Sequence, residues 1–478
     1  MTLLAPFAAR VAAAPDAAAL VAADGQVLSR GALDRWAAGV AGSWAARGVG
    51  PGTRVLLALP VSPGLYVALM ALWRLGAVAV FPEPSSGLAG LRHALAMAGP
   101  QRFAGPRGLG ALAAALSGRA ALALPLPLPL PEARNGVVPD SRPWPDAHPA
   151  LISFTSGSTG RPKGILRTHG FLLAQQRALA PLLQPDGPAR DLVCLPLFVL
   201  AGLGLGVPAA LPDADLRRPA AVDAARLLRQ AARDGLTRLL APPSVAAALA
   251  AQPGFAAFRA VFTGGGPVWP DVMRHLLDAA PGASIAAVYG STEAEPVAVQ
   301  QLEALTAADW AAMAGGAGLA AGTPAPGIAL RLTDGEIEVA GPHVQPGYLD
   351  PARDAETKRR EGGIVWHRTG DAGRIGAGGR LWLLGRLAGR AGPHFPFAVE
   401  AAARAWPGVT GAALLPLEGR ALLAVSGDPA QAAAWRERAL AFPGIEVVPL
   451  PAIPLDRRHQ SKVDYARLRR SLSVRARP

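Results

Sequence analysis

The sequence is short of cysteine, and this shortage excludes whole classes of protein. Cys194 is the only cysteine in 478 residues. A single thiol forms no intrachain disulfide and supplies no cysteine-rich metal site, so the chain is not a disulfide-stapled scaffold. Proteins without disulfides are typical of a reducing compartment, and we expect a cytoplasmic location.

Aromatic residues are also scarce, at 5% of the chain, while the net charge is +13. A basic chain attracts polyanions, which include nucleic acids, anionic membranes and small phosphate-bearing substrates. Apart from the tail between Arg457 and Arg477, the basic residues are spread thinly, with no aromatic stacking platform among them. Such a platform is typical of single-stranded nucleic-acid binding. We therefore predict no nucleic-acid partner and favour a small polyanionic substrate.

Long uninterrupted hydrophobic runs are missing as well. Leu192 to Leu211 carries no charge, but Pro196, Pro208 and three glycines interrupt it. These breaks favour a buried strand, loop and helix over a membrane span. The N-terminus lacks a basic start and Arg10 interrupts its apolar stretch, so we expect the first helix of the fold there rather than a signal peptide. We predict no transmembrane segment; peripheral contact with a membrane surface stays open.

What the sequence does contain is a repeated alternation of apolar strands and helices. Its length predicts two or more domains. Apolar strands expected at 239–241 and 260–263 flank a helix at 244–251, and Asp334-Gly335 marks a hairpin. This rhythm indicates an α/β protein with a parallel sheet, in which ligands bind beyond the carboxyl ends of the strands.

Proline and the capping residues predict local boundaries. Thr168 is a good N-cap for a helix over Gly170–Ala180, which Pro181 is expected to stop. The Leu-Pro repeat of Leu122–Pro131 predicts an extended, polyproline-like connector. A recognition peptide is the alternative interpretation of this repeat.

One loop stands out chemically. A strand expected from Leu151 to Phe154 runs into a segment of Ser, Thr and Gly that ends on Pro162-Lys163-Gly164. Glycines bring backbone N–H groups close to a ligand, while hydroxyls and a lysine add further donors, so the loop suits phosphate oxygens. It is not the P-loop of ordinary NTPases, because proline and glycine flank Lys163 and place it on a turn. The loop residues before Lys163 that we expect to bind are Thr155, Ser156, Gly157, Ser158, Thr159 and Gly160.

Two further segments follow predicted strands. The first is Gly264, Gly265 and Gly266, for which a tight turn is an equally good explanation. The second is Tyr289-Gly290-Ser291-Thr292-Glu293. A tyrosine ring after a strand can stack on a base, while the hydroxyl and carboxylate that follow can reach phosphate and Mg²⁺.

Together these segments resemble the adenylate-forming (ANL) superfamily, which includes AMP-dependent acyl-CoA synthetases, luciferases and nonribosomal-peptide adenylation domains. The matching motifs are TSGSTGRPKG at 155–164, YGSTE at 289–293, RTGD at 368–371, Gly385-Arg386 and SKVD at 461–464. The resemblance extends over essentially the full length of the chain.

The resemblance implies roles for individual residues. Gly264, Gly265, Gly266 and Tyr289 would pack against the adenine, and Gly290 and Ser291 would also bind the cofactor. Asp371, which we expect at the end of a strand, would accept the ribose hydroxyls, and Arg386 would contact the nucleotide. Thr292 and Lys462 would act at the α-phosphate, Lys163 at the β- and γ-phosphates, and Glu293 would hold Mg²⁺. The implied reaction is attack of a carboxylate on ATP, which gives an acyl-adenylate and pyrophosphate. Lys462 would neutralise the charge that develops between carboxylate and phosphate.

The resemblance also implies the architecture. We expect a large N-terminal AMP-binding domain over residues 1–385, built of stacked α/β subdomains with a mainly parallel sheet. A small α+β domain over residues 386–478 would follow on a hinge and be mobile.

The second half of the reaction is less certain from the motifs. Transfer to a thiol, of CoA or an acyl carrier protein, is the family's usual outcome, yet Ala388 and Val199 depart from the residues usual in acyl-CoA synthetases. Other segments, including Arg458-His-x-Ser-Lys462, are similar to fatty-acid ligases and olefin-pathway β-lactone synthetases, although Glu295 stands where an apolar residue is expected in the latter. Thiol transfer of an aliphatic acyl group is the leading interpretation. Closure of a 3-hydroxy acid to a β-lactone and a non-catalytic nucleotide-binding protein are the alternatives.

Overall fold

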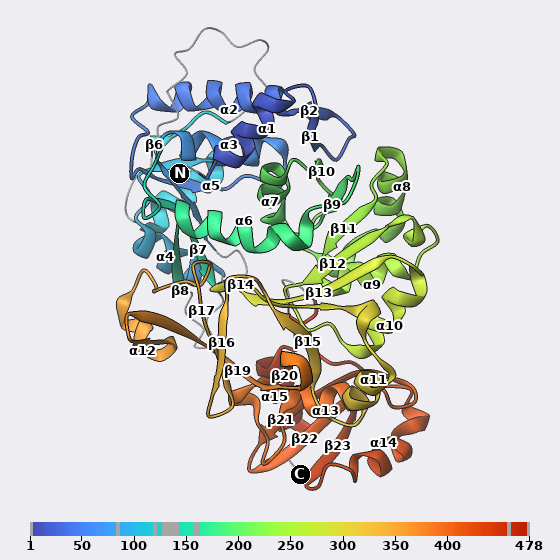
Figure 1. The fold of residues 1–478 in the computed structure, drawn as a ribbon. Helices are drawn as coiled ribbons and strands as arrows, with labels where there is room; N and C mark the ends of the chain where they lie inside the picture. Colours follow the sequence, from blue (N-terminus) through green and yellow to red (C-terminus); the bar gives the residue numbers. More distant parts are fainter. Residues whose placement is uncertain are drawn as a thin grey trace.

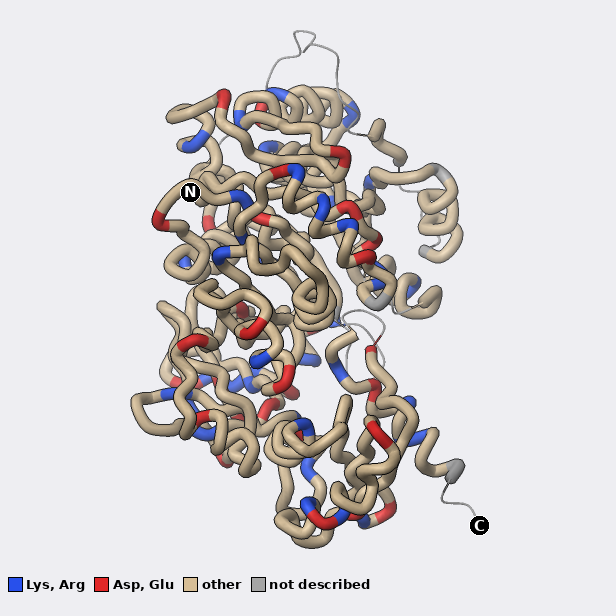
Figure 2. The backbone as a smooth tube through the Cα atoms, turned by 90° about the vertical axis from the view of Figure 1, so that its right-hand side faces the viewer, with Lys and Arg blue, Asp and Glu red and all other residues tan. Residues whose placement is uncertain are grey.

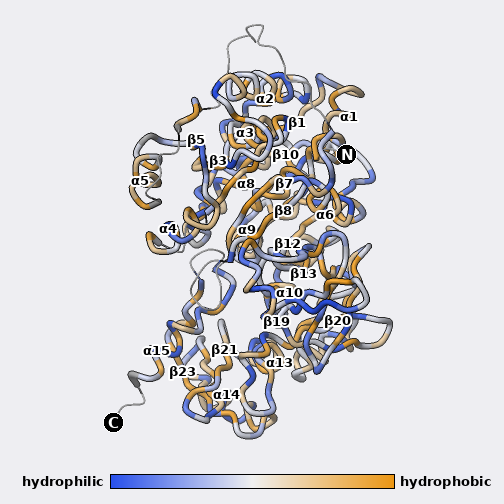
Figure 3. Tube along the Cα trace, turned by 90° about the vertical axis from the view of Figure 1, so that its left-hand side faces the viewer, coloured by the Kyte–Doolittle hydropathy of each residue, from blue (hydrophilic) through white to orange (hydrophobic). Residues whose placement is uncertain are grey.

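The computed structural model describes residues 3–82, 87–117, 122–126, 143–155, 163–456 and 460–475. Figure 1 shows helices wrapped around two sheets in the upper part and the C-terminal segment at the foot, where the chain ends. Hydrophobic residues concentrate along the strands and helices of the upper part, for example around α3 and β7 (Figure 3).

The first sheet has six strands in the order β6-β5-β3-β4-β7-β8. All neighbouring pairs are parallel except β7 and β8, which form an antiparallel pair. The strands are β3 (Arg54–Leu57), β4 (Val78–Phe81), β5 (Arg102–Ala104), β6 (Leu122–Ala123), β7 (Pro149–Thr155) and β8 (Lys163–Thr168). The helices that follow β3, β4 and β5 are α3 (Pro63–Arg74), α4 (Gly87–Ala98) and α5 (Arg107–Ser117).

The second sheet has fourteen strands and a parallel half. That half runs β1-β10-β9-β11-β12-β13, so the carboxyl ends of these strands share one edge. Its strands are β1 (Ala18–Val21), β9 (Asp191–Val193), β10 (Ala209–Ala210), β11 (Arg238–Ala241), β12 (Ala260–Gly264) and β13 (Ser284–Ser291), with β2 (Val27–Ser29) at the outer edge. The antiparallel half is formed by β14 (Ala294–Gln301), β15 (Leu319–Pro324), β16 (Ala329–Thr333), β17 (Glu336–Ala340), β18 (Lys358–Glu361), β19 (Ile364–Ile375) and β20 (Leu381–Arg386).

Helices cover these sheets and begin where the sequence offers a cap. The Thr168 side chain accepts from the Phe171 N–H, and Asp223 accepts from the Arg226 N–H, so both act as N-caps. The helices are α1 (Ala5–Ala13), α2 (Arg30–Ala45), α6 (His169–Leu183), α7 (Phe198–Leu205), α8 (Ala224–Asp234), α9 (Pro243–Ala250), α10 (Pro270–Ala279), α11 (Ala307–Ala314) and α12 (Asp354–Thr357).

Two local predictions were wrong. Pro181 does not stop its helix, because α6 continues to Leu183; a proline in the last turn removes only one backbone donor there. Leu122 and Ala123 are not polyproline-like but form β6 against β5, and Pro127–Pro131 of the repeat lie outside the described residues. The predicted α/β class with a mainly parallel sheet is confirmed.

The C-terminal segment has a core of its own. Strands β21 (Val409–Leu417), β22 (Arg420–Gly427) and β23 (Ile445–Leu450) form a three-stranded sheet, joined by α13 (Pro396–Ala403), α14 (Ala432–Ala439) and α15 (Tyr465–Arg475). Val399, Leu414 and Trp435 are buried together on one side of this sheet, while Leu468 and Leu472 of α15 pack on the other. The division of the chain at 385/386 and the mobility of the smaller part stay predictions.

The C-terminal segment touches the larger part through a contact of mixed character. Arg404 donates to both carboxylate oxygens of Asp271 at 2.7 and 2.6 Å. Beside this pair, the rings of Trp269 and Phe397 meet edge to face at 5.1 Å. The ion pair and the aromatic contact hold the segment in place together with Ala401, which is buried in an apolar cluster of the larger part.

Within the described residues, no helix combines the length and the apolar character needed to cross a bilayer. In Figure 2, basic and acidic residues are interspersed along the tube.

A buried carboxyl group makes the stability of the C-terminal segment depend on pH. Glu400 is 0% exposed and accepts from the Leu414 N–H and the Tyr465 hydroxyl, both at 2.8 Å. Burial outweighs these hydrogen bonds and raises the pKa of Glu400 from 4.5 to about 7. The folded state therefore binds more protons than the unfolded state between these two values, and stability falls as the pH rises through that window.

The free energy of unfolding of the wild type should fall by roughly 3 kcal/mol across this pH window because of Glu400. We expect Glu400→Gln to remove that fall, since a neutral amide does not titrate. Urea unfolding at pH 5 and pH 8 measures it, with the exposed Glu437→Gln as the control. An unchanged difference between the two pH values in Glu400→Gln would contradict the assignment.

Candidate functional site

The glycine-rich loop connects the antiparallel strands β7 and β8. Thr155, the last residue of β7, pairs with Lys163, the first residue of β8. Lys163 was expected on a turn; it begins a strand instead, because Gly164 continues the ladder with Phe154. The predicted binding residues Ser156, Gly157, Ser158, Thr159 and Gly160 lie outside the described residues, as does the side chain of Thr155.

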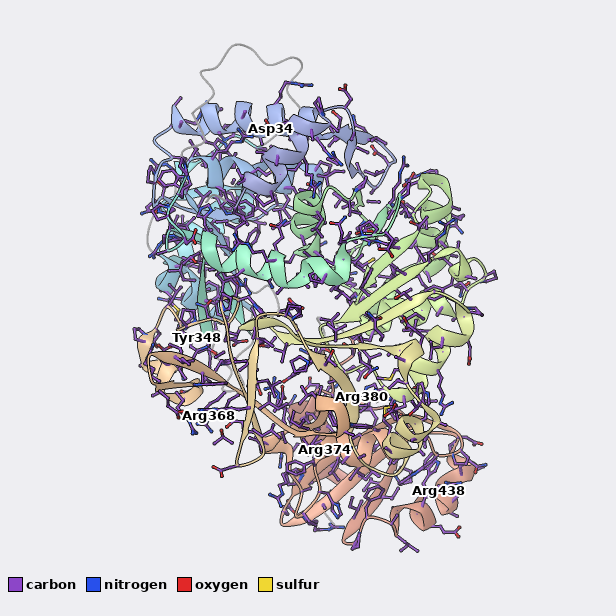
Figure 4. All side chains as sticks on the ribbon, viewed as in Figure 1. Asp34, Tyr348, Arg368, Arg374, Arg380 and Arg438 are labelled. Atoms are coloured by element: carbon purple, nitrogen blue, oxygen red, sulfur yellow. The ribbon has the colours of Figure 1, made fainter. Side chains whose placement is uncertain are left out.

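Lys163 points at an acidic residue and an aromatic ring. Its Nζ donates to Glu356 at 3.1 Å and lies 5.3 Å from the ring centroid of Tyr348, which Figure 4 labels. The Lys163 side chain is only 10% exposed, whereas that of Glu356 is 46% exposed. A phosphate entering this place would compete with the exposed carboxylate for the lysine.

The turn between β13 and β14 carries Thr292 and Glu293, and Glu293 lies beside Tyr348, whose ring Lys163 faces. The Tyr348 hydroxyl donates to Glu293 at 2.9 Å, and the Ser291 hydroxyl accepts from the Glu293 N–H. Arg167 of β8 donates to the Thr292 carbonyl at 2.8 Å and to the Ser153 hydroxyl at 2.9 Å. The turn after β13 is therefore fastened to the hairpin that carries the glycine-rich loop.

Glu293 remains ionised in this setting. Burial alone would raise the pKa of Glu293, but His367, the Tyr348 hydroxyl and Lys358 outweigh it and hold that pKa below its ordinary value. Lys358 lies beside His367, with 3.2 Å between Nζ and Nδ1. Burial lowers the pKa of Lys358 to about 8, and burial together with the Lys358 charge lowers the pKa of His367 to about 4.

Tyr289, Asp371 and Arg386 form a second cluster. The Tyr289 hydroxyl donates to Asp371 at 2.8 Å, and Arg386 pairs with the same carboxylate at 3.2 Å. Two local expectations were wrong here: Tyr289 lies within β13 rather than after it, and Asp371 lies inside the long strand β19 rather than at a strand end. Burial raises the pKa of Asp371, and burial together with the Asp371 charge raises the pKa of Tyr289 well above 10. Tyr289 therefore stays protonated and donates.

The three consecutive glycines lie at the carboxyl end of β12, and each has a steric reason to be glycine. A Cβ on Gly264 would lie 2.6 Å from the Val288 carbonyl oxygen. Gly265 has φ +82°, in the left-handed region. A Cβ on Gly266 would collide with the Ser461 hydroxyl and would lie 3.8 Å from Lys462 Cγ. The C-terminal lysine therefore approaches this loop across the boundary between the two parts of the chain.

Lys462 is held by its own loop. Asp456 accepts from the Ser461 and Lys462 N–H groups at 3.2 and 3.0 Å, and the Asp456 N–H donates to the Lys462 carbonyl at 2.8 Å. The ammonium faces two carboxylates, because the Lys462 charge lowers the pKa of both Asp371 and Glu295 against the effect of burial.

Lysine occurs at only three positions of this arginine-rich chain, and the structure brings all three to the site. These positions are 163, 358 and 462. Lys163 and Lys358 lie 5.3 and 5.4 Å from the centroid of the same ring, Tyr348. The ammonium of lysine is a compact point charge on a flexible stem, whereas the guanidinium of arginine is planar. The chain has lysine at the positions where a positive charge faces the site.

The site fits a nucleotide with its metal ion better than a metal held by the protein alone. No group of three or more His, Cys, Asp or Glu side chains gathers in the described residues in a way that would hold a metal. Mg²⁺ is usually bound through one or two carboxylates together with substrate phosphates, and Glu293 can supply one. The surrounding cations suit a polyphosphate.

Sequence reasoning missed four residues that the structure adds to this site, namely Arg167, Glu356, Lys358 and His367. It also gave Tyr348 no role. The scarcity of lysine is a signal in the sequence that singles out Lys358. Nothing local marks the other three, since their contacts join segments distant in sequence.

Comparison with known proteins agrees with this geometry. A family model described as "AMP-binding enzyme" matches residues 7–349. The chain is 31% identical to an olefin β-lactone synthetase of Stenotrophomonas maltophilia over 91% of this chain and 88% of that protein. It is 30% identical to a feruloyl-CoA synthase of an Amycolatopsis species over 82% of this chain and 81% of that protein.

Solved structures share the fold at lower identity. ATP-bound MatB from Rhodopseudomonas palustris superimposes with a TM-score of 0.83 at 22% identity, covering 100% of both chains. The amide bond synthetase McbA from Marinactinospora thermotolerans gives a TM-score of 0.81 at 22% identity, covering 98% of this chain and 99% of that one.

We expect Asp371→Ala to weaken ATP binding at least about 30-fold, because it removes the carboxylate that would accept the ribose hydroxyls and that Tyr289 and Arg386 hold in place. Calorimetric titration of ATP in the presence of Mg²⁺ measures the effect. Asp215→Ala is the matched control, since Asp215 forms an exposed pair with Arg217. Equal affinity of wild type and Asp371→Ala would contradict a nucleotide at this carboxylate.

Proposed function

Because the chain belongs to the AMP-binding enzyme family of adenylate-forming ligases, we propose that the site described above joins a carboxylic acid to AMP. The chain is an AMP-forming ligase, and its reaction converts ATP and the acid into an acyl-adenylate and pyrophosphate. The residue roles below are our proposal. The observation that carries them is the approach of Lys462 to Gly266, which brings the C-terminal segment to the same place as Asp371.

The nucleotide lies across the two clusters. The adenine packs between Tyr289 and the Gly264–Gly266 loop, and Asp371 accepts the ribose hydroxyls with Arg386 beside it. The phosphates extend towards Thr292, Lys163 and the loop after β7. When bound, Mg²⁺ supplies charge neutralisation at the phosphates, and Glu293 holds it.

The reaction requires the protein to position the two reactants and to stabilise the negative charge on the phosphates. A carboxylate oxygen of the acid attacks the α-phosphorus, a new P–O bond forms, and the bond to pyrophosphate breaks. Lys462 and the Thr292 hydroxyl stabilise the negative charge that spreads over the α-phosphate. Lys163 moves from Glu356 to the β- and γ-phosphates and stabilises the leaving pyrophosphate.

A mostly apolar cavity near this site suits an aliphatic acyl chain. The cavity lies between α1, α3, α6 and α7 and has Gln175 and Gln176 as the only polar side chains among its described lining residues. Its wall includes Leu197, Phe198 and Gly204, and α7 begins just after the carboxyl end of β9. The acyl chain runs along α7.

The acyl group then passes to a thiol, of CoA or of an acyl carrier protein. A second candidate is closure of a 3-hydroxy acid through its own hydroxyl, because a relative 31% identical over 91% of the chain is an olefin β-lactone synthetase. Product analysis with and without CoA, using a 3-hydroxy fatty acid, separates the two. In the first case a thioester forms only with CoA, and in the second AMP release is independent of it.

We expect Lys462→Ala to lower ATP–pyrophosphate exchange by about 10²–10³-fold while ATP affinity changes far less, since the lost charge acts mainly at the transition state. The measurement is the rate of ATP–pyrophosphate exchange with each member of a panel of fatty acids as the acid substrate. Arg470→Ala, a change on the exposed face of α15, is the control. A Lys462→Ala protein that exchanges at the wild-type rate overturns the assignment.

A further inference from the structure

Glu295 is a carboxylate at the site that the proposed mechanism does not use. It is the second residue of β14, and it is half-buried between the buried residues Ala294 and Pro296. Glu295 lies against the backbone of β13, since a Cβ placed on Gly290 would lie 3.1 Å from both Cα and Cβ of Glu295.

Two cations face this carboxylate without binding it directly. Burial desolvates the Glu295 carboxylate, and the charges of Arg167 and Lys462 act on it. Arg167 donates to Ser153 and to the Thr292 carbonyl. In the described part of the chain, no hydrogen bond or ion pair reaches the Glu295 carboxylate. A half-buried acceptor with no donor costs free energy, so the site is complete only when something donates to it.

The acid substrate is the molecule placed to do so. Lys462 must lie close to the reacting carboxylate and the α-phosphate, and the same lysine faces Glu295. Glu295 therefore borders the first carbons of the bound acid. A plain alkyl chain would leave the carboxylate desolvated and unpaired, whereas a donor on those carbons would satisfy it.

We propose that Glu295 is a specificity-determining residue that accepts a hydrogen bond from a hydroxyl group on the first carbons beside the carboxyl group of the acid. This inference rests on the proposed function and narrows its substrate class. A neutral hydroxyl fits better than an ammonium, because Arg167 and Lys462 already direct two positive charges at this place and would repel a third.

The test is a matrix of substrates and variants in the ATP–pyrophosphate exchange assay. The probes are decanoic, 2-hydroxydecanoic, 3-hydroxydecanoic and 3-aminodecanoic acid. For the wild type we expect kcat/KM of at least one hydroxy acid to exceed that of decanoic acid about tenfold or more, the effect of one hydrogen bond to a charged acceptor. Glu295→Leu should remove that preference and improve decanoic acid, while Glu295→Gln, whose amide oxygen still accepts, should keep part of it.

Glu303→Gln is the matched control. Glu303 follows the same strand and accepts from the Ser284 hydroxyl and the Ile285 N–H, away from the site. It should leave the ratio of hydroxy acid to plain acid unchanged, and thermal melting of every variant separates lost folding from lost preference.

Three results would overturn the inference. The first is an equal wild-type rate for decanoic acid and both hydroxydecanoic acids. The second is a preference for a hydroxydecanoic acid that survives in Glu295→Leu. The third is a preference for 3-aminodecanoic acid over both hydroxydecanoic acids. In each case exchange itself still occurs and the proposed function stands. Absence of exchange with every acid, together with ATP that still binds, would instead count against the proposed function.

Discussion

The whole arrangement depends on one electrostatic interaction. Lys462 of the C-terminal segment brings its positive charge to the carboxyl ends of β12 and β13, next to the carboxylates of the larger part. Gly266 has no side chain and leaves the room that the Ser461–Lys462 turn fills. Asp456 closes that turn and so holds the backbone from which the lysine side chain extends. On the other side of the contact, the ion pair of Arg404 with Asp271 holds the segment against the larger part. A polyanion between Lys462 and Lys163 would be stabilised from both sides.

Carboxylates and cations alternate around this meeting point, and each carboxylate has a different environment. Glu293 is held ionised by Tyr348 and its basic neighbours, which suits a group that holds a metal ion. Asp371 is bound on both oxygens, by Tyr289 and Arg386. Glu295 is the exception, since it faces charges without being bound by any described residue. Environments that differ this far let neighbouring acids do different work at a single site.

The sequence predicted the parts of this picture that are local. Strands, caps and glycine-rich turns follow from residue type, and Tyr289, Glu293, Asp371 and Lys462 were singled out by short motifs. The contacts of Arg167 and Glu356 could not be predicted, because each joins strands or turns that only the sheet topology brings together. Pro181 and the placement of Asp371 inside β19 show the limit of boundary rules, since tertiary pairing extends an element past the residue that should end it. The small domain's boundary and its movement remain predictions.

The central claim is that one nucleotide is held jointly by residues from both parts of the chain. A crystal structure with a stable acyl-adenylate analogue, such as an acylsulfamoyl adenosine, tests it most directly. The account predicts the adenine beside Tyr289, the ribose hydroxyls on Asp371 and the acyl–sulfamoyl junction between Thr292 and Lys462. An analogue bound with Lys462 directed to solvent, or in a cavity that excludes Asp371, would contradict it.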